Sequence, residues 1–203
     1  GSTNVAIGTS ALDANTTASN NTAIGGSSLG LNTTGTENTG VGSGSLRTNS
    51  TGNYNTAVGY ECLRLSTTSD ENTAMGADSL AANTTADDNT AIGLDTLKAN
   101  TTGANNVAIG RDALVANTTA SSNVAVGMES LKTVTTGTGN VAVGFQALKT
   151  NAANFNTAVG HEVLESTTTG TENTAMGVGA MKANTTGSTN VAIGTSALDA
   201  NTT

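Results

Sequence analysis

The sequence predicts an all-β fold, a parallel β-solenoid of twelve short coils. A stretch of the form Asn-Thr/Val-Ala-Ile/Val/Met-Gly returns every 17 residues, with one step of 16 between Asn140 and Asn156. Residue character alternates within this stretch, which is the period-two pattern of a β-strand. Aromatic residues make up only 2%, and Pro and Trp are absent, so a wide core cannot be filled. A thin core repeated along one axis accounts for all three observations.

Each coil begins at an Asn, from which we number its positions 1 to 17. Positions 1 to 5, residues 55–59 in the fourth coil, predict a strand, and the invariant Gly at position 5 predicts a corner with positive φ or no room for a Cβ. Position 9, almost always Leu, predicts a short second strand, and Asn-Thr-Thr-Gly/Ala at positions 12 to 15 predicts a polar return loop. The Asn side chains at positions 1 and 12 are expected to stack as amide ladders. The coils start at Asn4, Asn21, Asn38, Asn55, Asn72, Asn89, Asn106, Asn123, Asn140, Asn156, Asn173 and Asn190.

Alternation in the first strand separates Thr/Val and Ile/Val/Met on one face from Asn, Ala and Gly on the other. We expect the Ile/Val/Met and Leu columns to form the core, which is represented by Val58, Leu63, Ile92, Leu97, Ile109 and Leu114. About three apolar side chains per coil barely offset the entropy of ordering the backbone, so a second chain is expected to bury more surface.

The smooth Ala-Gly face of the first strand is the expected contact between chains, since another backbone can approach it closely. Its representative residues are Ala57, Ala74, Ala91, Ala108 and Ala125. The alternative is that Ala simply fits the inside of a thin, monomeric coil.

The chain is expected to be a single repeat domain, 1–203, cut from a longer array. Residues 187–203 are identical to residues 1–17, although neighbouring coils differ at many positions. The offset of 186 residues therefore suggests one super-repeat and the start of the next. Composition alone would also allow a disordered, low-complexity segment, but the periodic apolar positions argue against it.

Charge and composition exclude several classes of function. The net charge is −8 without any basic run, which disfavours nucleic acid, and no apolar run is long enough to span a bilayer. Cys62 is the only cysteine and His161 the only histidine, so neither a disulfide framework nor a metal or catalytic constellation is expected. We expect no enzyme and no cofactor, since an enzyme on such a scaffold would need paired acidic residues in a groove.

Position 7 is acidic in five successive coils, at Glu61, Asp78, Asp95, Asp112 and Glu129. A divalent cation such as calcium would relieve their repulsion, but calcium prefers 6–8 oxygen ligands. Basic residues three positions later offer a simpler neutralisation, at Arg64, Lys98 and Lys132.

Eight Asn residues at position 12 begin an Asn-x-Thr sequence, which is the N-glycosylation acceptor pattern. They are Asn15, Asn32, Asn49, Asn83, Asn100, Asn117, Asn184 and Asn201. The alternative is that Asn-Thr-Thr suits a turn and an amide ladder.

Runs such as NTAVGYECL, NVAVGFQAL and NTAIGLDTL, followed by NTTG, resemble the head repeats of YadA-like trimeric autotransporter adhesins. They look even more like repeats of bacteriophage tail-fibre proteins, and the resemblance covers essentially the whole chain. It implies a left-handed parallel β-roll, three chains about one axis, and a place on a cell surface or virion. The coil is longer than in the adhesin pattern, and Asn-Thr/Val-Ala replaces Asn-Ser-Val-Ala.

We therefore expect a structural module of an extracellular fibre or adhesin, a rigid spacer and attachment scaffold that associates with itself. The alternatives are a tail-fibre shaft that binds a receptor and, in a different class, an ice-binding solenoid. Ice binding needs a broad flat face with Thr alternating along a strand, whereas the threonines at positions 13 and 14 are adjacent. Receptor contacts are expected at variable positions 6, 7, 10, 11, 16 and 17, with Tyr54, Tyr60, Phe145 and Phe155 as the aromatic candidates.

Overall fold

The computed structural model describes all residues, 1–203, and consists of twelve three-residue strands in one parallel sheet, without a helix. Each strand covers positions 2 to 4 of its coil, as the alternation predicts. The strands are β1 (Val5–Ile7), β2 (Thr22–Ile24), β3 (Thr39–Val41), β4 (Thr56–Val58), β5 (Thr73–Met75), β6 (Thr90–Ile92), β7 (Val107–Ile109), β8 (Val124–Val126), β9 (Val141–Val143), β10 (Thr157–Val159), β11 (Thr174–Met176) and β12 (Val191–Ile193).

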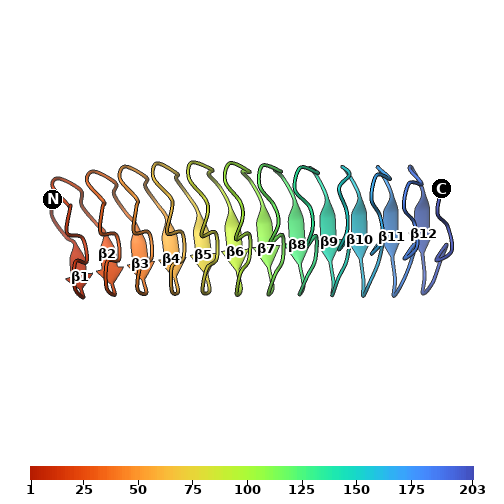
Figure 1. Cartoon of the computed structure of the whole chain (residues 1–203), viewed down its shortest axis with the longest axis horizontal. Helices are drawn as coiled ribbons and strands as arrows, with labels where there is room; N and C mark the ends of the chain where they lie inside the picture. Colours follow the sequence, from red (N-terminus) through yellow and green to blue (C-terminus); the bar gives the residue numbers. More distant parts are fainter.

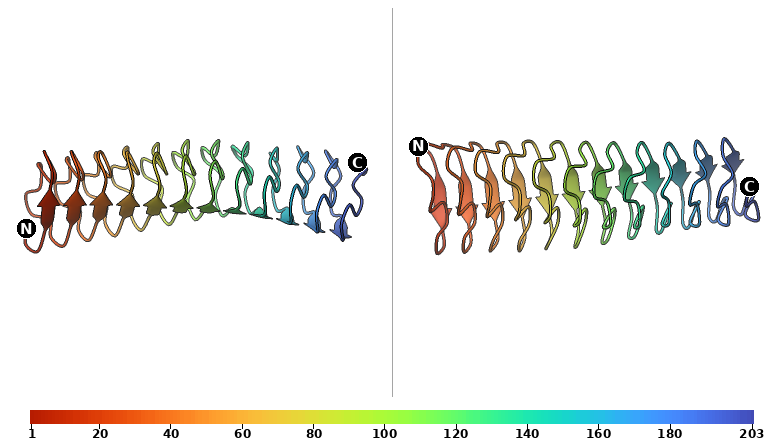
Figure 2. Two further views of the ribbon diagram at one scale, coloured as in Figure 1. Left: turned by 90° about the horizontal axis from the view of Figure 1, so that it is seen from below. Right: turned by 45° about the horizontal axis from the view of Figure 1, so that its top comes forward.

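The strands pair strictly in sequence order, so the chain is a stack of coils with its two ends at opposite ends of a rod (Figure 1). Equivalent positions face one another in every pair, as Ala91 of β6 faces Ala108 of β7. At about 4.8 Å per strand the rod is roughly 53 Å long. The strand direction turns gradually from one end to the other, as expected for the twist of β-sheets (Figure 2).

The short ninth coil keeps this register. Its missing residue falls in the return loop, where Asn151, Ala152 and Ala153 stand in place of four residues, and β9 and β10 still pair residue for residue. A deletion there leaves the sheet intact because the loop closes between strands that are already aligned.

The part of each coil outside the strand is also ordered by hydrogen bonds between coils. Of 133 backbone hydrogen bonds, 111 lie outside the strands. They include bonds between coils, such as Leu97 N–H to the carbonyl of Ala113 at 3.1 Å, and bonds within one coil, such as Asn100 N–H to the carbonyl of Leu97 at 3.1 Å. The predicted second strand does not form. Instead the residue at position 9, Leu in all coils but one, adopts a left-handed conformation with φ between 49° and 53°, within a run of turns. That kink turns each Leu side chain into the coil.

The Gly corner at position 5 is confirmed as a position with positive φ. These glycines have φ between 120° and 145°, a region that other residues rarely adopt. A Cβ at Gly59 would lie 2.4 Å from the carbonyl oxygen of Gly76 in the next coil. Backbone conformation and close stacking therefore both require Gly at this corner.

The Asn at position 1 joins the strand to the return loop and to the neighbouring coils. Asn106 is representative and fully buried: its Oδ1 accepts the backbone N–H of Asn123 at 3.0 Å, and its Nδ2 donates to the carbonyl of Ala120 at 2.9 Å and to Oδ1 of Asn89 at 3.1 Å. The first of these bonds recurs between all successive coils, at 2.9 or 3.0 Å. The predicted ladder is present, with an additional tie to the loop.

The predicted core is only half right. Leu63, Leu97 and Leu114 are fully buried, but Ile92 and Ile109 are 37% exposed and Val58 is half-buried. The Ala of each interior strand is buried in place of the larger aliphatic residue. Alternation divides a strand into two faces without saying which is inside, and the narrow coil, already filled by Leu from the opposite wall, has room for only a methyl group. At Gly40, the one position 3 without Ala, a Cβ would lie 2.6 Å from Ser28 Oγ and 3.5 Å from Leu29 Cγ.

Candidate functional surfaces

The outer face of the sheet carries an apolar stripe along the whole rod. We define this outer face as positions 2, 4 and 6 of the coils. Position 4 contributes an aliphatic or Met side chain in every coil, and Met75 and Met176 are 42% and 48% exposed. Position 6 adds exposed Tyr60, Leu94 and Val178. Sequence reasoning placed position 4 inside the coil and so missed this face.

The five Ala residues expected at a contact between chains lie inside the chain's own core. Ala57, Ala74, Ala91, Ala108 and Ala125 are all 0% exposed. The alternative reading, that Ala fits a thin coil, is the one the structure supports. Replacing any of them by Leu would overpack the core, so such a variant tests folding and says nothing of assembly.

The opposite side of each coil, positions 7 to 11, carries most of the charges. The exceptions are Arg111 at position 6 and six acidic residues at positions 16 and 17, which are Glu37, Asp70, Glu71, Asp87, Asp88 and Glu172. Ion pairs tie consecutive coils together: Lys98 lies 3.1 Å from Asp78 and 2.9 Å from Asp95, and Lys132 lies 2.8 Å from Glu129 and 3.9 Å from Asp112. These are four of the five carboxylates singled out as calcium candidates. The fifth, Glu61, pairs with Arg64 at 3.4 Å.

No group of three His, Cys, Asp or Glu side chains is arranged to hold a metal ion. Each of the five carboxylates forms an ion pair with a lysine or an arginine.

Glu129 is the most strongly stabilised carboxylate of this row. Hydrogen bonds from Lys132 at 2.8 Å and from Gln146 Nε2 at 2.7 Å lower its pKa from 4.5 to about 2. Lys149 adds a third favourable contact at 3.5 Å. Because the side chain is 15% exposed, solvent screens these interactions only in part.

The eight candidate glycosylation residues do not present their amides to solvent. Asn32, Asn49, Asn83, Asn100, Asn117 and Asn184 are fully buried, while Asn15 and Asn201, at the two ends of the stack, are half-buried. Asn100 Nδ2 donates to the carbonyl of Gly103 at 2.9 Å and to Oδ1 of Asn83 at 3.2 Å. At the six buried sites the folded chain leaves no space beside the amide for a glycan, which agrees with the alternative that Asn-Thr-Thr serves the turn and the ladder.

This ladder breaks where position 12 is not Asn. Oδ1 of Asn15 has no partner, although Asn32 follows it in the next coil. Oδ1 of Asn49 and of Asn117 also has no partner, and there the next coil offers Ser66 and Val134 at the same position. Neither of those side chains has an amide group to donate.

The only cysteine, the only histidine and two of the aromatic candidates lie apart from one another. Cys62 is fully buried, and burial raises the pKa of its thiol to about 12. His161 is exposed and stacks on Phe145, with ring centroids 5.0 Å apart and planes 28° apart. Tyr54 and Phe155 project into solvent at 55% and 60% exposure, at the corner before the strand.

The chain contains no helix long and apolar enough to cross a bilayer. Comparison with protein-family models, curated proteins and solved structures gave no match to the chain. The likeness to adhesin and tail-fibre repeats therefore remains a prediction from the repeat motif.

Proposed function

We propose that the chain is a structural module of an extracellular fibre or adhesin, acting as a rigid spacer and attachment scaffold. The observation that carries this proposal is the outer face, an apolar stripe that continues through all twelve strands of a straight stack. Large exposed apolar patches on a protein mark interaction sites. A repeating rod with one continuous apolar side is suited to lateral association with copies of itself.

The size of the outer face fits a stable contact. Five residues of strand and corner are about 16 Å wide, and twelve coils extend about 53 Å, so the face offers roughly 850 Å². A standard interface buries about 800 Å² on each partner. We propose a homotrimer wound as left-handed β-rolls, as the repeat motif implies, with the outer faces of three chains against one another.

Light scattering of the purified chain tests this association. The wild type is expected to have the mass of three chains. Ile92→Lys, Ile109→Lys and Val126→Lys, introduced together, place three charges on the outer face and should leave a monomer with unchanged circular dichroism.

The matched control carries three lysines at position 11, as Ala82→Lys, Ala99→Lys and Ala116→Lys. These half-buried residues lie on the side away from the strands, and this variant should remain associated. A monomeric wild type, or an outer-face variant that still associates, would contradict the proposed assembly.

Two alternatives keep the same scaffold. A phage tail-fibre shaft would use the variable corner positions to bind a receptor, and electron microscopy of the parent material would distinguish a virion fibre from a cell-surface one. Ice binding is the other alternative. It is favoured by position 2, which is Thr in seven strands and places a half-buried or exposed Thr or Val beside the aliphatic residue of position 4. Thermal hysteresis that disappears in the outer-face variant would support ice binding.

A further inference from the structure

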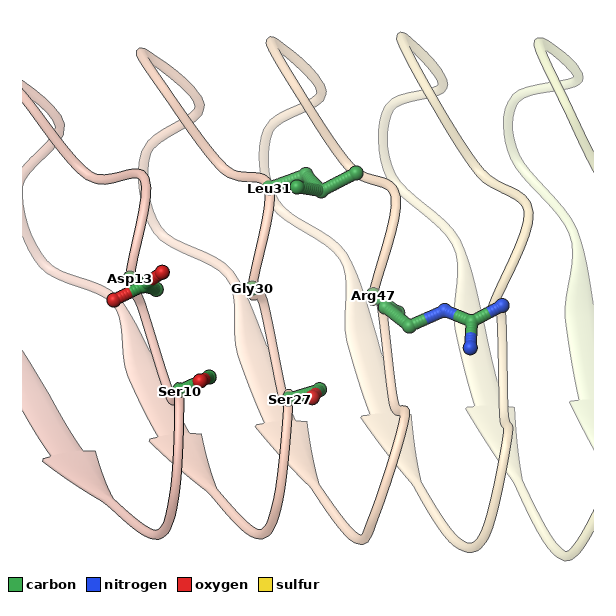
Figure 3. Close-up of a pocket in the computed structure, with 6 residues that line it drawn as sticks. All are labelled: Ser10, Asp13, Ser27, Gly30, Leu31 and Arg47. Carbon is green, nitrogen blue, oxygen red and sulfur yellow. The ribbon is translucent and has the colours of Figure 1, made fainter.

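The charged side of the rod has one hollow, of about 200 Å³, in the first three coils. Ser10 and Asp13 of the first coil, Ser27, Gly30 and Leu31 of the second, and Arg47 of the third line it (Figure 3). The hollow exists because Gly30 has no side chain at position 10, where other coils carry residues such as Lys98 or Lys132.

The two charges beside the hollow are unpaired. Six of the seven lysine and arginine side chains in the chain take part in an ion pair, and Arg47 is the exception. Asp13 has no ion pair either, although both residues occupy position 10 like the paired bases. With the coil of Gly30 between them, their backbones are two strand spacings apart, about 9.6 Å.

We propose that this hollow binds a small zwitterion, with its amino group at Asp13 and its carboxylate at Arg47. Opposite charges at the two ends select a ligand with the complementary pair of charges, and a ligand with one charge leaves the other end unmatched. The guanidinium is suited to a carboxylate because it donates two parallel hydrogen bonds.

The remaining lining residues suit the middle of such a ligand. In Figure 3 the Ser10 and Ser27 hydroxyls lie along one edge of the hollow and the Leu31 side chain along the other. Leu31 is 55% exposed, and so offers apolar surface to a methylene chain. The Arg47 side chain extends away from Gly30 in this view, and binding requires it to turn back across the gap, which no ion pair opposes.

The proposal is independent of the fibre function, because it concerns three consecutive coils and a side of the rod away from the outer face. Sequence reasoning allowed contacts at positions 7, 10 and 11 without selecting these coils. The signal available in the sequence was Gly30 between an acidic and a basic residue at the same position.

Titration of the isotope-labelled chain with 6-aminohexanoate at low salt, followed by amide chemical shifts, tests the site. We expect saturable shifts confined to the lining residues, with a Kd on the order of 1 mM, since the site is open and its ion pairs are partly screened. Hexanoate and hexylammonium, each with a single charge, should bind about 10-fold more weakly or not at all.

Variants separate the roles of charge and space. Arg47→Gln and Asp13→Asn should each weaken binding about 10-fold, and Gly30→Lys, which introduces the residue that other coils have at this position, should abolish it. Arg64→Gln, one coil further along, is the matched control and should bind like the wild type. Equal binding of the single-charge probes, unchanged binding by Arg47→Gln, or no shifts at the lining residues would overturn the proposal. Arg47→Gln and Asp13→Asn keep the test valid even where Gly30→Lys perturbs the fold.

Discussion

Removal of one position-1 amide tests the main structural tie of the solenoid. Asn106→Ala deletes four hydrogen bonds. Oδ1 accepts from the N–H of Asn123 and, at 3.4 Å, from Nδ2 of Asn123, which still donates to the carbonyl of Gly137. Nδ2 donates to the carbonyl of Ala120 and to Oδ1 of Asn89. Ala120 O still accepts from Asn117 at 3.0 Å, and Asn89 Oδ1 still accepts the backbone N–H at position 106, at 3.0 Å. The buried N–H of Asn123 is therefore the group left without a partner.

The expected cost follows from this inventory. A buried donor without a partner costs about 1–3 kcal/mol, and each of the other three bonds contributes about 0.5–1.5 kcal/mol, so the substitution should cost about 2.5–7.5 kcal/mol. Asn106→Asp separates the two functions of the amide. It keeps an acceptor for Asn123 but places a carboxylate against the carbonyl of Ala120, so it should also destabilise at neutral pH.

Amide hydrogen exchange at Asn123 is the appropriate assay, because the free energy of opening is then read at one coil. Repeat proteins open coil by coil, so a single unfolding midpoint is less informative. Thr119→Ala is the control: the side chain lies in the same coil, is exposed and makes no hydrogen bond. The reasoning is refuted if Asn123 exchanges no faster in Asn106→Ala than in Thr119→Ala, or if the cost is below about 0.5 kcal/mol.

Two further predictions concern the corner and the charged row. Gly93→Ala should destabilise the stack by more than about 2 kcal/mol in chemical denaturation, because φ is 138° and the new Cβ would lie 2.8 Å from the carbonyl carbon of Gly110. Gly26→Ala, whose Cβ would meet nothing nearer than 3.8 Å, should be neutral, and equal effects of the two changes would contradict this account. Glu129→Gln should cost up to about 1 kcal/mol at pH 7. Folding lowers the pKa of Glu129 from 4.5 to about 2, so the extra stability of the wild type over Glu129→Gln is complete above pH 4.5 and is lost as the pH falls towards 2. A difference in stability that does not change with pH would refute this prediction.

Much of the fold was predictable from the repeat. The period set the coil count, position 5 identified the corner that Gly59 confirms, and alternation located each strand to within a residue. The absence of a second strand was not predictable, because Leu97 and its equivalents adopt a left-handed conformation that Leu ordinarily avoids. Leu97 in this conformation is buried and is hydrogen-bonded both to the next coil, at the carbonyl of Ala113, and within its own coil, from Asn100 N–H. A sequence pattern does not display these contacts.

The contacts on the candidate surfaces were also predictable only in part: the sequence indicates those within one coil but not those between coils. Pairing of Glu61, Asp95 and Glu129 with bases three residues later was visible in the sequence, since both partners belong to one coil. The ties between coils, such as Lys98 to Asp78, and the hollow between Asp13 and Arg47 depend on which coils become neighbours.

By itself the sequence determined a parallel solenoid of twelve coils, its Gly corners, its Leu column and its Asn ladders. The tertiary structure alone decided which face of the strand is inside. Both faces alternate equally well in sequence, but Leu from the opposite wall leaves space for only one methyl group. Ala108 therefore points into the core and Ile109 points out. In each strand the larger side chain, at position 4, is the one that offers apolar surface to a partner.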